Sequence, residues 1–380
     1  MTERWYSGPG DRIATRGVFR HGCRTVLVVV PFVGAGTRLM DVLPLLEADH
    51  RISTVFAVAP NSEGAACPSA EEFLRAHSCL VLPWQEALRY EFDLVLAVGP
   101  HGLAGLRGKS LLLDRESVPN GECVLPDVLA LSHDSELDLL AESCQEALPA
   151  ATVVGDISYD RLLASIPFRG RYRQALGLSR GQRLVVTSTR RPDLVGRMVD
   201  ELSACRFTVA VTIHPEVWDA HGGWQVRAWL ADGLDAGALL LPPGQGWQGA
   251  LIAADLVIGD CDPVTRYGAA IGLPTMVVAS PEEGCRDPLS DLVRRLAPPV
   301  RADHPLADEV RAGMAGDRSW QDLVAARITS RPGRAGELLR QLLYRTLDLR
   351  EPARAAPCPP VPLPCPITGA TWWWKKTVGE

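Results

Sequence analysis

The stretch ADLVIGDCDPVTRYGAAIGLPTMVVA, Ala254–Ala279, decides the fold class of this 380-residue chain. An apolar run over Leu256–Ile258 gives way to the polar turn GDCDPVT. The small-residue segment RYGAAIGL and the apolar TMVVA follow it. Open α/β sheets show this succession of buried strand, turn, short helix and second buried strand. The polar turn then lies at the carboxyl end of a parallel strand, where such sheets bind ligands.

Apolar runs alternate with helix-like segments along most of the chain. The strand-like runs include 25–32, 53–60, 93–100 and 110–114 in the first half, and 183–189, 207–215 and 238–243 in the second. We therefore predict two α/β units in tandem, each with a parallel sheet covered by helices, and a ligand cleft between them. The predicted bounds are an N-terminal arm over 1–22, domains over 23–165 and 166–350, and a Pro- and Trp-rich tail over 351–380.

Composition narrows the function classes. The chain has 47% hydrophobic and 22% charged residues, as soluble globular proteins do. Its net charge is −6 and it has no long basic run, which argues against a nucleic-acid partner. The ten cysteines include no CxxC pair, so we expect no zinc site, no other metal and no redox dithiol. The polar N-terminus and the short apolar runs predict a cytoplasmic protein.

Three turns at strand ends in the second half carry side chains that suit a ligand. The turn TSTRRPD, Thr187–Asp193, supplies hydroxyls and two guanidiniums beside a helix start, a combination that attracts anions. His214 ends the next strand, and Asp262 to Thr265 belong to GDCDPVT, where free amides of a helix start can hold a diphosphate. Taken alone, each turn more often has a structural role, as a solvated helix start, a turn histidine or a capping turn. Their combination at one sheet edge favours a ligand site.

In order and spacing these motifs resemble the GT-B superfamily. Within it they are similar to the branch of UDP-N-acetylglucosamine 2-epimerases and CDP-glycerol glycerophosphotransferases. The resemblance runs from Asp127 to Ala279 and includes the hinge motif VVGDISYDRL, Val153–Leu162, and the pair His214–Pro215. It implies two Rossmann-like domains and a nucleotide-activated donor bound by the second. The predicted substrate contacts are Thr187, Arg190, Arg191, His214, Asp262, Val264 and Thr265.

Two departures from the epimerases bear on the reaction. Cys261–Asp262 stands where those enzymes have Ser-Gly or Ser-Ser, and Arg266 and Tyr267 replace their acidic pair. On the acceptor side, GPHGLAG resembles the His-Gly turn of the glycerophosphotransferases and makes His101 a candidate base, with an exposed turn histidine as the structural alternative. Glu116 and His133 follow other strand-like runs and are further candidates, which the sequence does not rank.

Three hypotheses about function follow. The first is a metal-independent glycosyl- or glycerophosphotransferase that uses a nucleotide-activated donor as substrate and needs no cofactor. The second is an inactive GT-B-fold binding or regulatory protein, and the third a sugar-nucleotide epimerase or hydrolase. The tail adds a candidate membrane or protein contact, or alternatively a packed end, through Trp372, Trp373, Trp374, Lys375 and Lys376.

Overall fold

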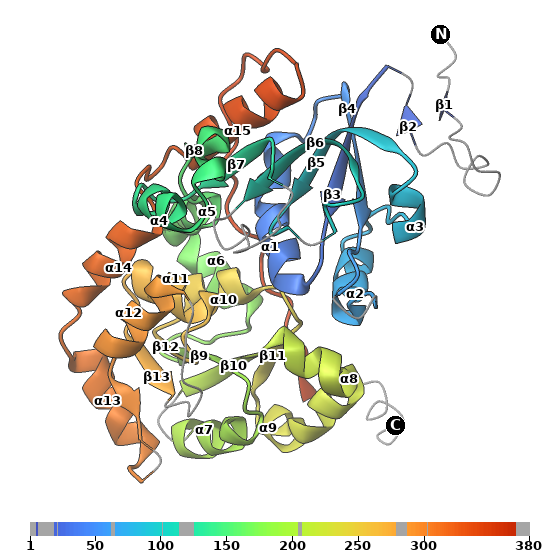
Figure 1. Cartoon of the computed structure of the whole chain (residues 1–380). Helices are drawn as coiled ribbons and strands as arrows, with labels where there is room; N and C mark the ends of the chain where they lie inside the picture. Colours follow the sequence, from blue (N-terminus) through green and yellow to red (C-terminus); the bar gives the residue numbers. More distant parts are fainter. Residues whose placement is uncertain are drawn as a thin grey trace. The chain divides into compact units, whose positions relative to one another are not determined.

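The chain folds into two compact units, each built on a parallel sheet of six strands (Figure 1). Unit 1 comprises Met1–Asp160 and Thr329–Cys358, and unit 2 comprises Arg161–Ile328 and Pro359–Glu380. The computed structural model describes residues 22–61, 65–100, 102–113, 125–203, 207–278, 287–301 and 303–369, with two short strands near the N-terminus. This architecture confirms the predicted α/β class with two units.

The sheet of unit 1 has the order β4-β3-β5-β6-β7-β8, with every pair parallel. Its central strand β3 is a continuous apolar run because both faces are covered: Val26 and Val28 face one core cluster, and Leu27 and Val29 face another. The strands are β3 (Arg24–Val29), β4 (Ile52–Ala57), β5 (Glu91–Ala97), β6 (Arg107–Leu113), β7 (Val128–Leu131) and β8 (Ala151–Val153).

Helices of unit 1 connect these strands, and the N-terminal arm contributes a small separate sheet. The helices are α1 (Val33–Val42), α2 (Pro68–Ala76), α3 (Trp84–Ala87), α4 (Ser135–Ser143) and α15 (Ala335–Thr346), with 3-10 turns η1 (Leu43–Leu45) and η3 (Gln145–Ala150). Within the predicted arm over 1–22, β1 (Trp5–Tyr6) pairs antiparallel with β2 (Phe19–Arg20).

The sheet of unit 2 has the order β11-β10-β9-β12-β13-β14 and is also parallel throughout. The chain runs outward from β9 to β10 and β11, then returns to the other side of β9 with β12. This reversal is the topological switch point at which open α/β sheets bind ligands. The strands are β9 (Arg183–Thr189), β10 (Phe207–Ile213), β11 (Leu239–Leu241), β12 (Leu256–Gly259), β13 (Thr275–Val278) and β14 (Pro299–Val300).

Helices surround the sheet of unit 2 and complete its core. They are α6 (Arg169–Ala175), α7 (Asp193–Ser203), α8 (Pro215–Trp229), α9 (Ala231–Asp235), α10 (Trp247–Ala253), α11 (Pro263–Ala270), α12 (Pro288–Leu296), α13 (Leu306–Ala315) and α14 (Trp320–Ile328), with the 3-10 turn η4 (Ile166–Phe168). Within the described part of the chain, no helix is long and apolar enough to cross a membrane.

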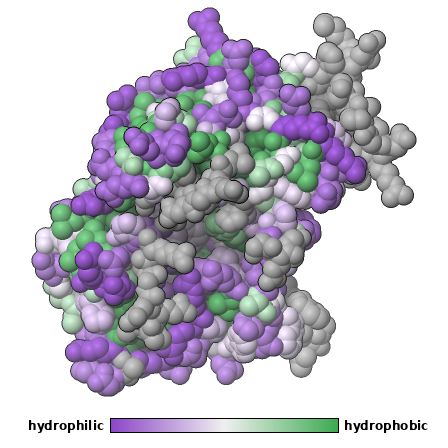
Figure 2. Space-filling view, viewed as in Figure 1, coloured by the Kyte–Doolittle hydropathy of each residue, from purple (hydrophilic) through white to green (hydrophobic). Residues whose placement is uncertain are grey.

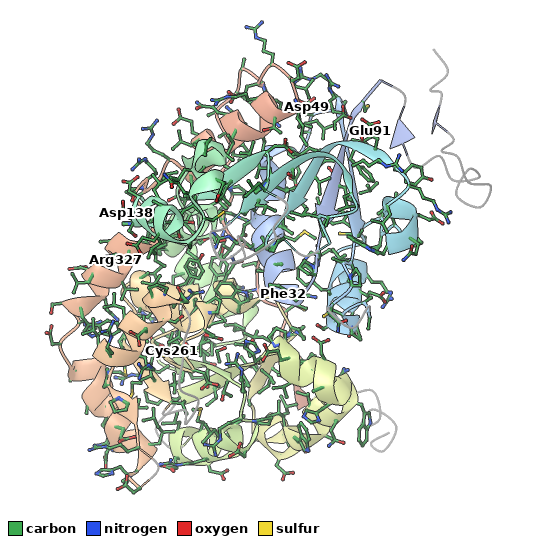
Figure 3. All side chains as sticks on the ribbon, in the orientation of Figure 1. Phe32, Asp49, Glu91, Asp138, Cys261 and Arg327 are labelled. Carbon is green, nitrogen blue, oxygen red and sulfur yellow. The ribbon has the colours of Figure 1, made fainter. Side chains whose placement is uncertain are left out.

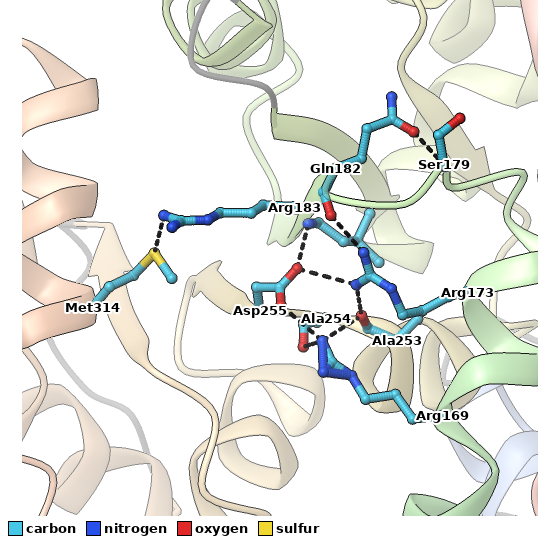
Figure 4. A network of polar contacts seen from close by, with 10 residues as sticks. Arg169, Arg173, Ser179, Gln182, Arg183, Ala253, Ala254, Asp255 and Met314 are labelled. Atoms are coloured by element: carbon cyan, nitrogen blue, oxygen red, sulfur yellow. Dashed lines mark hydrogen bonds and ion pairs between the residues drawn. The ribbon is translucent and has the colours of Figure 1, made fainter.

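One carboxylate ties the first helix of unit 2 to its sheet (Figure 4). Asp255, just before β12, accepts hydrogen bonds from Arg169 at 2.8 Å, from Arg173 at 3.1 Å and from the backbone N–H of Leu184 at 2.8 Å. Both guanidiniums also donate to the carbonyl of Ala253. The helix α6 is thereby fixed to the start of two central strands by charge-assisted hydrogen bonds.

The predicted hinge motif runs from the end of β8 into helix α5 (Ile157–Ser165), within which the chain passes from unit 1 to unit 2. Asp160 caps the start of α15 by accepting hydrogen bonds from the backbone N–H groups of Gly333 at 2.7 Å and Ala335 at 2.9 Å. Gly155 has φ +92°, and a Cβ there would lie 2.9 Å from Thr329 Oγ1. Through these contacts the motif fixes the segment that begins at Thr329, where the chain returns to unit 1.

The observed units differ from the predicted domain bounds: unit 2 begins at Arg161, and the predicted tail is divided after Cys358. The segment 329–350 was predicted to belong to the second domain, but Thr329–Cys358 belongs to unit 1. The reason is that α15 buries Leu339, Leu343 and Tyr344 in the core cluster around β3. The sequence shows the apolar face of this helix but not the sheet that it covers.

The described part of the Pro-rich segment divides between the units: it belongs to unit 1 up to Cys358 and packs on unit 2 from Pro359 onward. The Tyr172 hydroxyl donates to the carbonyl of Val361 at 2.6 Å, and Ile367 forms an antiparallel bridge with Leu240 in β11. The predicted contact residues Trp372, Trp373, Trp374, Lys375 and Lys376 lie outside the described residues.

The substitution Leu343→Ala is expected to destabilise unit 1 by about 2–5 kcal/mol, because it leaves a cavity beneath α15. Leu323→Ala on α14 is the matched control, since Leu323 is 57% exposed. Urea unfolding measures the loss, and amide hydrogen exchange in β3 and β5 locates it. Equal stability of the two variants would contradict the assignment of α15 to unit 1.

Candidate functional site

Three polar turns meet at the carboxyl edge of the unit 2 sheet because β10, β9 and β12 are neighbours. The N–H of His214, after β10, donates to the carbonyl of Thr189 at 3.1 Å, and the N–H of Asp260, after β12, donates to the carbonyl of Ser188 at 3.2 Å. The turn after β9 therefore lies between the other two. The structure brings together the three turns that the sequence singled out.

Asp262 organises the start of α11. Its carboxylate accepts hydrogen bonds from the Thr265 backbone N–H at 3.0 Å, from the Thr265 hydroxyl at 2.9 Å and from the Ser188 hydroxyl. This N-cap joins the helix to β9 as well as to its own strand. The negative charge of Asp262 is thus compensated by donors inside the turn.

Asp260 holds the turn after β9 in the same way. Its carboxylate accepts a hydrogen bond from the backbone N–H of Arg190 at 2.8 Å. Burial raises the pKa of Asp260, and the charge of Asp262 raises it further, while the bond from Arg190 lowers it. Both carboxylates of GDCDPVT therefore have structural partners at the sheet edge.

Gly259 and Cys261 give this turn its shape. A Cβ at Gly259 would clash with the Thr265 hydroxyl and would lie 3.1 Å from the Ser188 carbonyl, so α11 can approach β12 only at a glycine. Cys261, labelled in Figure 3, is buried and has φ +63°, the left-handed region that costs energy for a residue with a side chain. A strained residue between strand and helix is common at ligand sites.

Arg190, His214 and Glu216 form a polar cluster on the outer side of the three turns. A guanidinium nitrogen of Arg190 lies 3.2 Å from His214 Nε2, and Arg190 Nε donates to Glu216 Oε2 at 3.4 Å. Arginine only donates, so His214 Nε2 is the acceptor and the neutral ring carries its proton at Nδ1. That buried Nδ1 lies 3.4 Å from Glu216 Oε2 but makes no hydrogen bond.

The environment keeps His214 neutral. Burial lowers its pKa because it disfavours the charged imidazolium, and the neighbouring Arg190 lowers it further, whereas Asp262 and Glu216 act in the opposite direction. His214 can therefore serve as a hydrogen-bond donor or acceptor at neutral pH, but it adds no positive charge.

Arg191 extends the cationic side of the site. Its guanidinium donates to Asp193 at 2.7 Å, and 54% of its side chain is exposed. Arg190 is 40% exposed, and its partner Glu216 is 72% exposed. Exposed ion pairs of this kind contribute little to stability, so both arginines can exchange their carboxylates for a ligand anion at small cost.

Three of the predicted contact residues are buried. Thr187 lies within β9 and is fully buried, with its hydroxyl unpartnered, because both faces of this parallel strand are covered. Thr265 is also fully buried, and Val264 is 7% exposed. Direct contact of these side chains with a ligand stays a prediction; in this structure Thr265 bonds to Asp262.

The sequence analysis missed two features of this edge. Glu216 pairs with Arg190 and lies close to His214, and its position two residues after a strand-end histidine was the available signal. The turn after β11 also lies at this edge, next to β10, and contains Gly244 and Gly246 at φ +67° and +73°. Two glycines after an apolar run could have identified it.

Among the candidate bases, only His133 lies within the described residues; His101 and Glu116 lie outside them. The Ser135 backbone N–H donates to His133 Nδ1 at 3.0 Å, so the neutral ring carries its proton at Nε2. Both nitrogens are then engaged or protonated. This arrangement suits a structural cap at the start of α4 and is poor for a general base.

The two α/β units, each with a parallel six-stranded sheet, have the organisation of the GT-B fold. No cluster of three or more His, Cys, Asp or Glu side chains that could hold a metal occurs within the described residues.

Solved structures with this fold include enzymes. The wall teichoic acid polymerase TagF, in a variant soaked with CDPG, has a TM-score of 0.58 and 10% identity, with 86% of this chain and 89% of that chain covered. S. aureus MnaA with UDP has a TM-score of 0.55 and 11% identity over 87% and 99% of the two chains. A UDP-N-acetylglucosamine 2-epimerase has a TM-score of 0.52 and 12% identity, with 88% of this chain and 99% of that chain covered.

At these identities the likeness establishes the fold. No family model matches this sequence, and neither does any curated protein.

The substitution Gly259→Ala is expected to destabilise the protein by about 1–3 kcal/mol, since the new methyl group forces α11 away from β12. Gly196→Ala in α7 is the matched control, because a Cβ there meets nothing within 4 Å. Thermal unfolding measures the difference. A Gly259→Ala protein as stable as the control would show that α11 does not pack as described.

The lowered pKa of His214 predicts a pH dependence of stability. The unfolded chain takes up a proton at this histidine near pH 6.5, roughly the ordinary value, whereas the folded chain does so only at lower pH. The contribution of His214 to stability is therefore present above that value and is lost as pH falls from there towards the folded pKa.

We expect His214→Gln to remove this part of the acid destabilisation, measured as the unfolding free energy between pH 7.5 and 5 (about the range in which histidine titrates). His304→Gln, at a half-exposed histidine, is the control. Parallel pH profiles for wild type and His214→Gln would contradict the assigned environment.

Proposed function

We propose that the chain is a transferase that takes a group from a nucleotide-activated donor, with the donor diphosphate bound at the carboxyl edge of the unit 2 sheet. The observation that carries the proposal is the cluster of Arg190, Arg191 and His214 at the switch point of a GT-B fold. Solved structures of the same fold, determined with CDPG or UDP, give it independent support.

The cluster would stabilise the charge that develops on the leaving nucleotide. When an acceptor hydroxyl attacks, the bond between the transferred group and the nucleotide phosphate breaks, and its electron pair remains on the phosphate oxygen. Arg190 and Arg191 would neutralise this charge, and His214 would hydrogen-bond to the same ligand. The acceptor hydroxyl would lose its proton to a base. These groups perform the step without a metal ion.

The two aspartates of GDCDPVT fit this proposal as supports. Asp260 holds the backbone of Arg190, and Asp262 holds α11 against Ser188, so neither carboxylate needs to face the donor phosphates. Their structural bonds explain how an acidic turn can border an anion site. They would set the positions of the groups that bind.

A donor-binding protein without transferase activity is the second candidate. One observation favours it: Asp262 takes both the N–H and the hydroxyl of Thr265, which leaves fewer donors for phosphate at the start of α11. Weaker stabilisation of the leaving group would lower the rate of transfer more than the affinity for the donor.

Thermal unfolding with UDP, CDP and their sugar or glycerol derivatives tests the donor site. A ligand at a hundred times its dissociation constant adds about 2.7 kcal/mol of stability. We expect one base to stabilise the protein and Arg190→Ala to abolish most of the shift. Arg311→Ala, which removes an exposed paired arginine on α13, should leave it unchanged.

The outcomes separate the candidates. No shift with any nucleotide, or a shift that Arg190→Ala retains, would contradict a donor site at this edge. A shift without group transfer to any acceptor or to water would support the binding protein. Release of the nucleotide without an acceptor would indicate a hydrolase or epimerase.

A further inference from the structure

The turn between α5 and α6 exposes three large apolar side chains within six residues. Leu163 is 37% exposed, Ile166 42% and Phe168 40%. On the face drawn in Figure 2, by comparison, hydrophilic residues cover most of the surface. We call Leu163, Ile166, Pro167, Phe168 and Arg171 the Phe168 patch.

These side chains cannot turn inward because other residues already fill the inner face. Leu162 and Ser165 are fully buried, and Tyr172 is 2% exposed. The Ser165 hydroxyl donates to the Arg161 carbonyl at 2.7 Å and accepts from the Val361 N–H at 2.9 Å. The buried side of the turn is therefore held by packing and hydrogen bonds. Its exposed positions carry Leu, Ile and Phe, where a solvated face would carry polar residues.

Arginines lie beside the patch in α6. Although the whole chain has a net charge of −6, this helix carries Arg169, Arg171 and Arg173 and no Asp or Glu. Asp255, from another segment, pairs with Arg169 and Arg173, so this triad retains one positive charge (Figure 4).

A cation lies directly on the apolar group. The guanidinium carbon of Arg171 is 5.5 Å from the centre of the Phe168 ring. Apolar side chains beside arginines suit the boundary between phosphate headgroups and acyl chains, where the ring enters the apolar layer and the guanidinium binds phosphate. A surface of this kind matches an anionic lipid in both charge and polarity.

We propose that the Phe168 patch binds the surface of a bilayer that contains anionic phospholipid. The contact is peripheral: Leu163, Ile166 and Phe168 enter the boundary of the acyl region, and Arg171 contacts lipid phosphate. Because the patch uses none of the side chains of the sheet-edge cluster, this inference stands independently of the proposed donor.

Co-sedimentation of the full chain with phosphatidylcholine vesicles, with and without phosphatidylglycerol, tests the proposal. We expect binding to the anionic vesicles that weakens as salt is added. Ile166→Asp and Phe168→Asp should each weaken binding roughly tenfold or more, since each removes a large apolar contact and adds a negative charge. Arg171→Gln should weaken it about fivefold, because one cation near an anionic surface contributes about 1 kcal/mol.

Leu323→Asp on α14 is the matched control, since it changes an even more exposed leucine of the same unit and should leave binding unchanged. All altered positions are exposed, and unchanged thermal unfolding confirms that the variants are folded. A chain ended at residue 369 separates the patch from the Trp-rich tail and should still bind.

Three results would overturn the proposal. They are no binding of wild type to anionic vesicles, equal binding by wild type and Phe168→Asp, and loss of binding only when residues 370–380 are removed. A change of oligomeric state in Phe168→Asp without vesicle binding by wild type would also overturn it and would assign the patch to a protein contact.

Discussion

The parallel pairing of β9 with β10 on one side and β12 on the other is the constraint on which the site depends. It brings three turns, far apart in sequence, to one edge of the sheet. Backbone bonds from His214 and Asp260 to the end of β9 then fix these turns at hydrogen-bond distance. The buried Val, Leu and Ile side chains of the three strands stabilise this pairing. The hydrophobic core thereby fixes the positions of the polar turns that follow the strands.

The contacts of the acidic turn GDCDPVT change the interpretation of its two aspartates. In the sequence, two aspartates argue against an anion nearby. In the structure, Asp260 and Asp262 bind donors of their own and neighbouring turns, and the exposed positions are taken by Arg190 and Arg191. The chain thus engages two carboxylates within the turns, and the two exposed guanidiniums pair with the exposed carboxylates of Glu216 and Asp193. Charge at a site depends on where side chains point, which composition does not show.

Sequence patterns predicted the fold class because continuous apolar runs such as 25–32 require a sheet covered on both faces. They did not predict that α15 covers the first sheet, since an apolar helix face does not specify its partner. Thr187 was chosen for its hydroxyl, although it lies within a strand that is buried on both faces. Glu216 was missed because its importance comes from contacts with Arg190 and His214.

Amide hydrogen–deuterium exchange of the full chain, with and without a saturating nucleoside diphosphate, tests the central claim most directly. The account predicts slower exchange in the turns after β9, β10 and β12, around Arg191, Glu216 and Thr265, when the diphosphate is bound. The start of β12 and the far ends of α13 and α14 should not change. Protection confined to other segments, or none at a concentration that saturates binding, would contradict a donor site at this edge of unit 2.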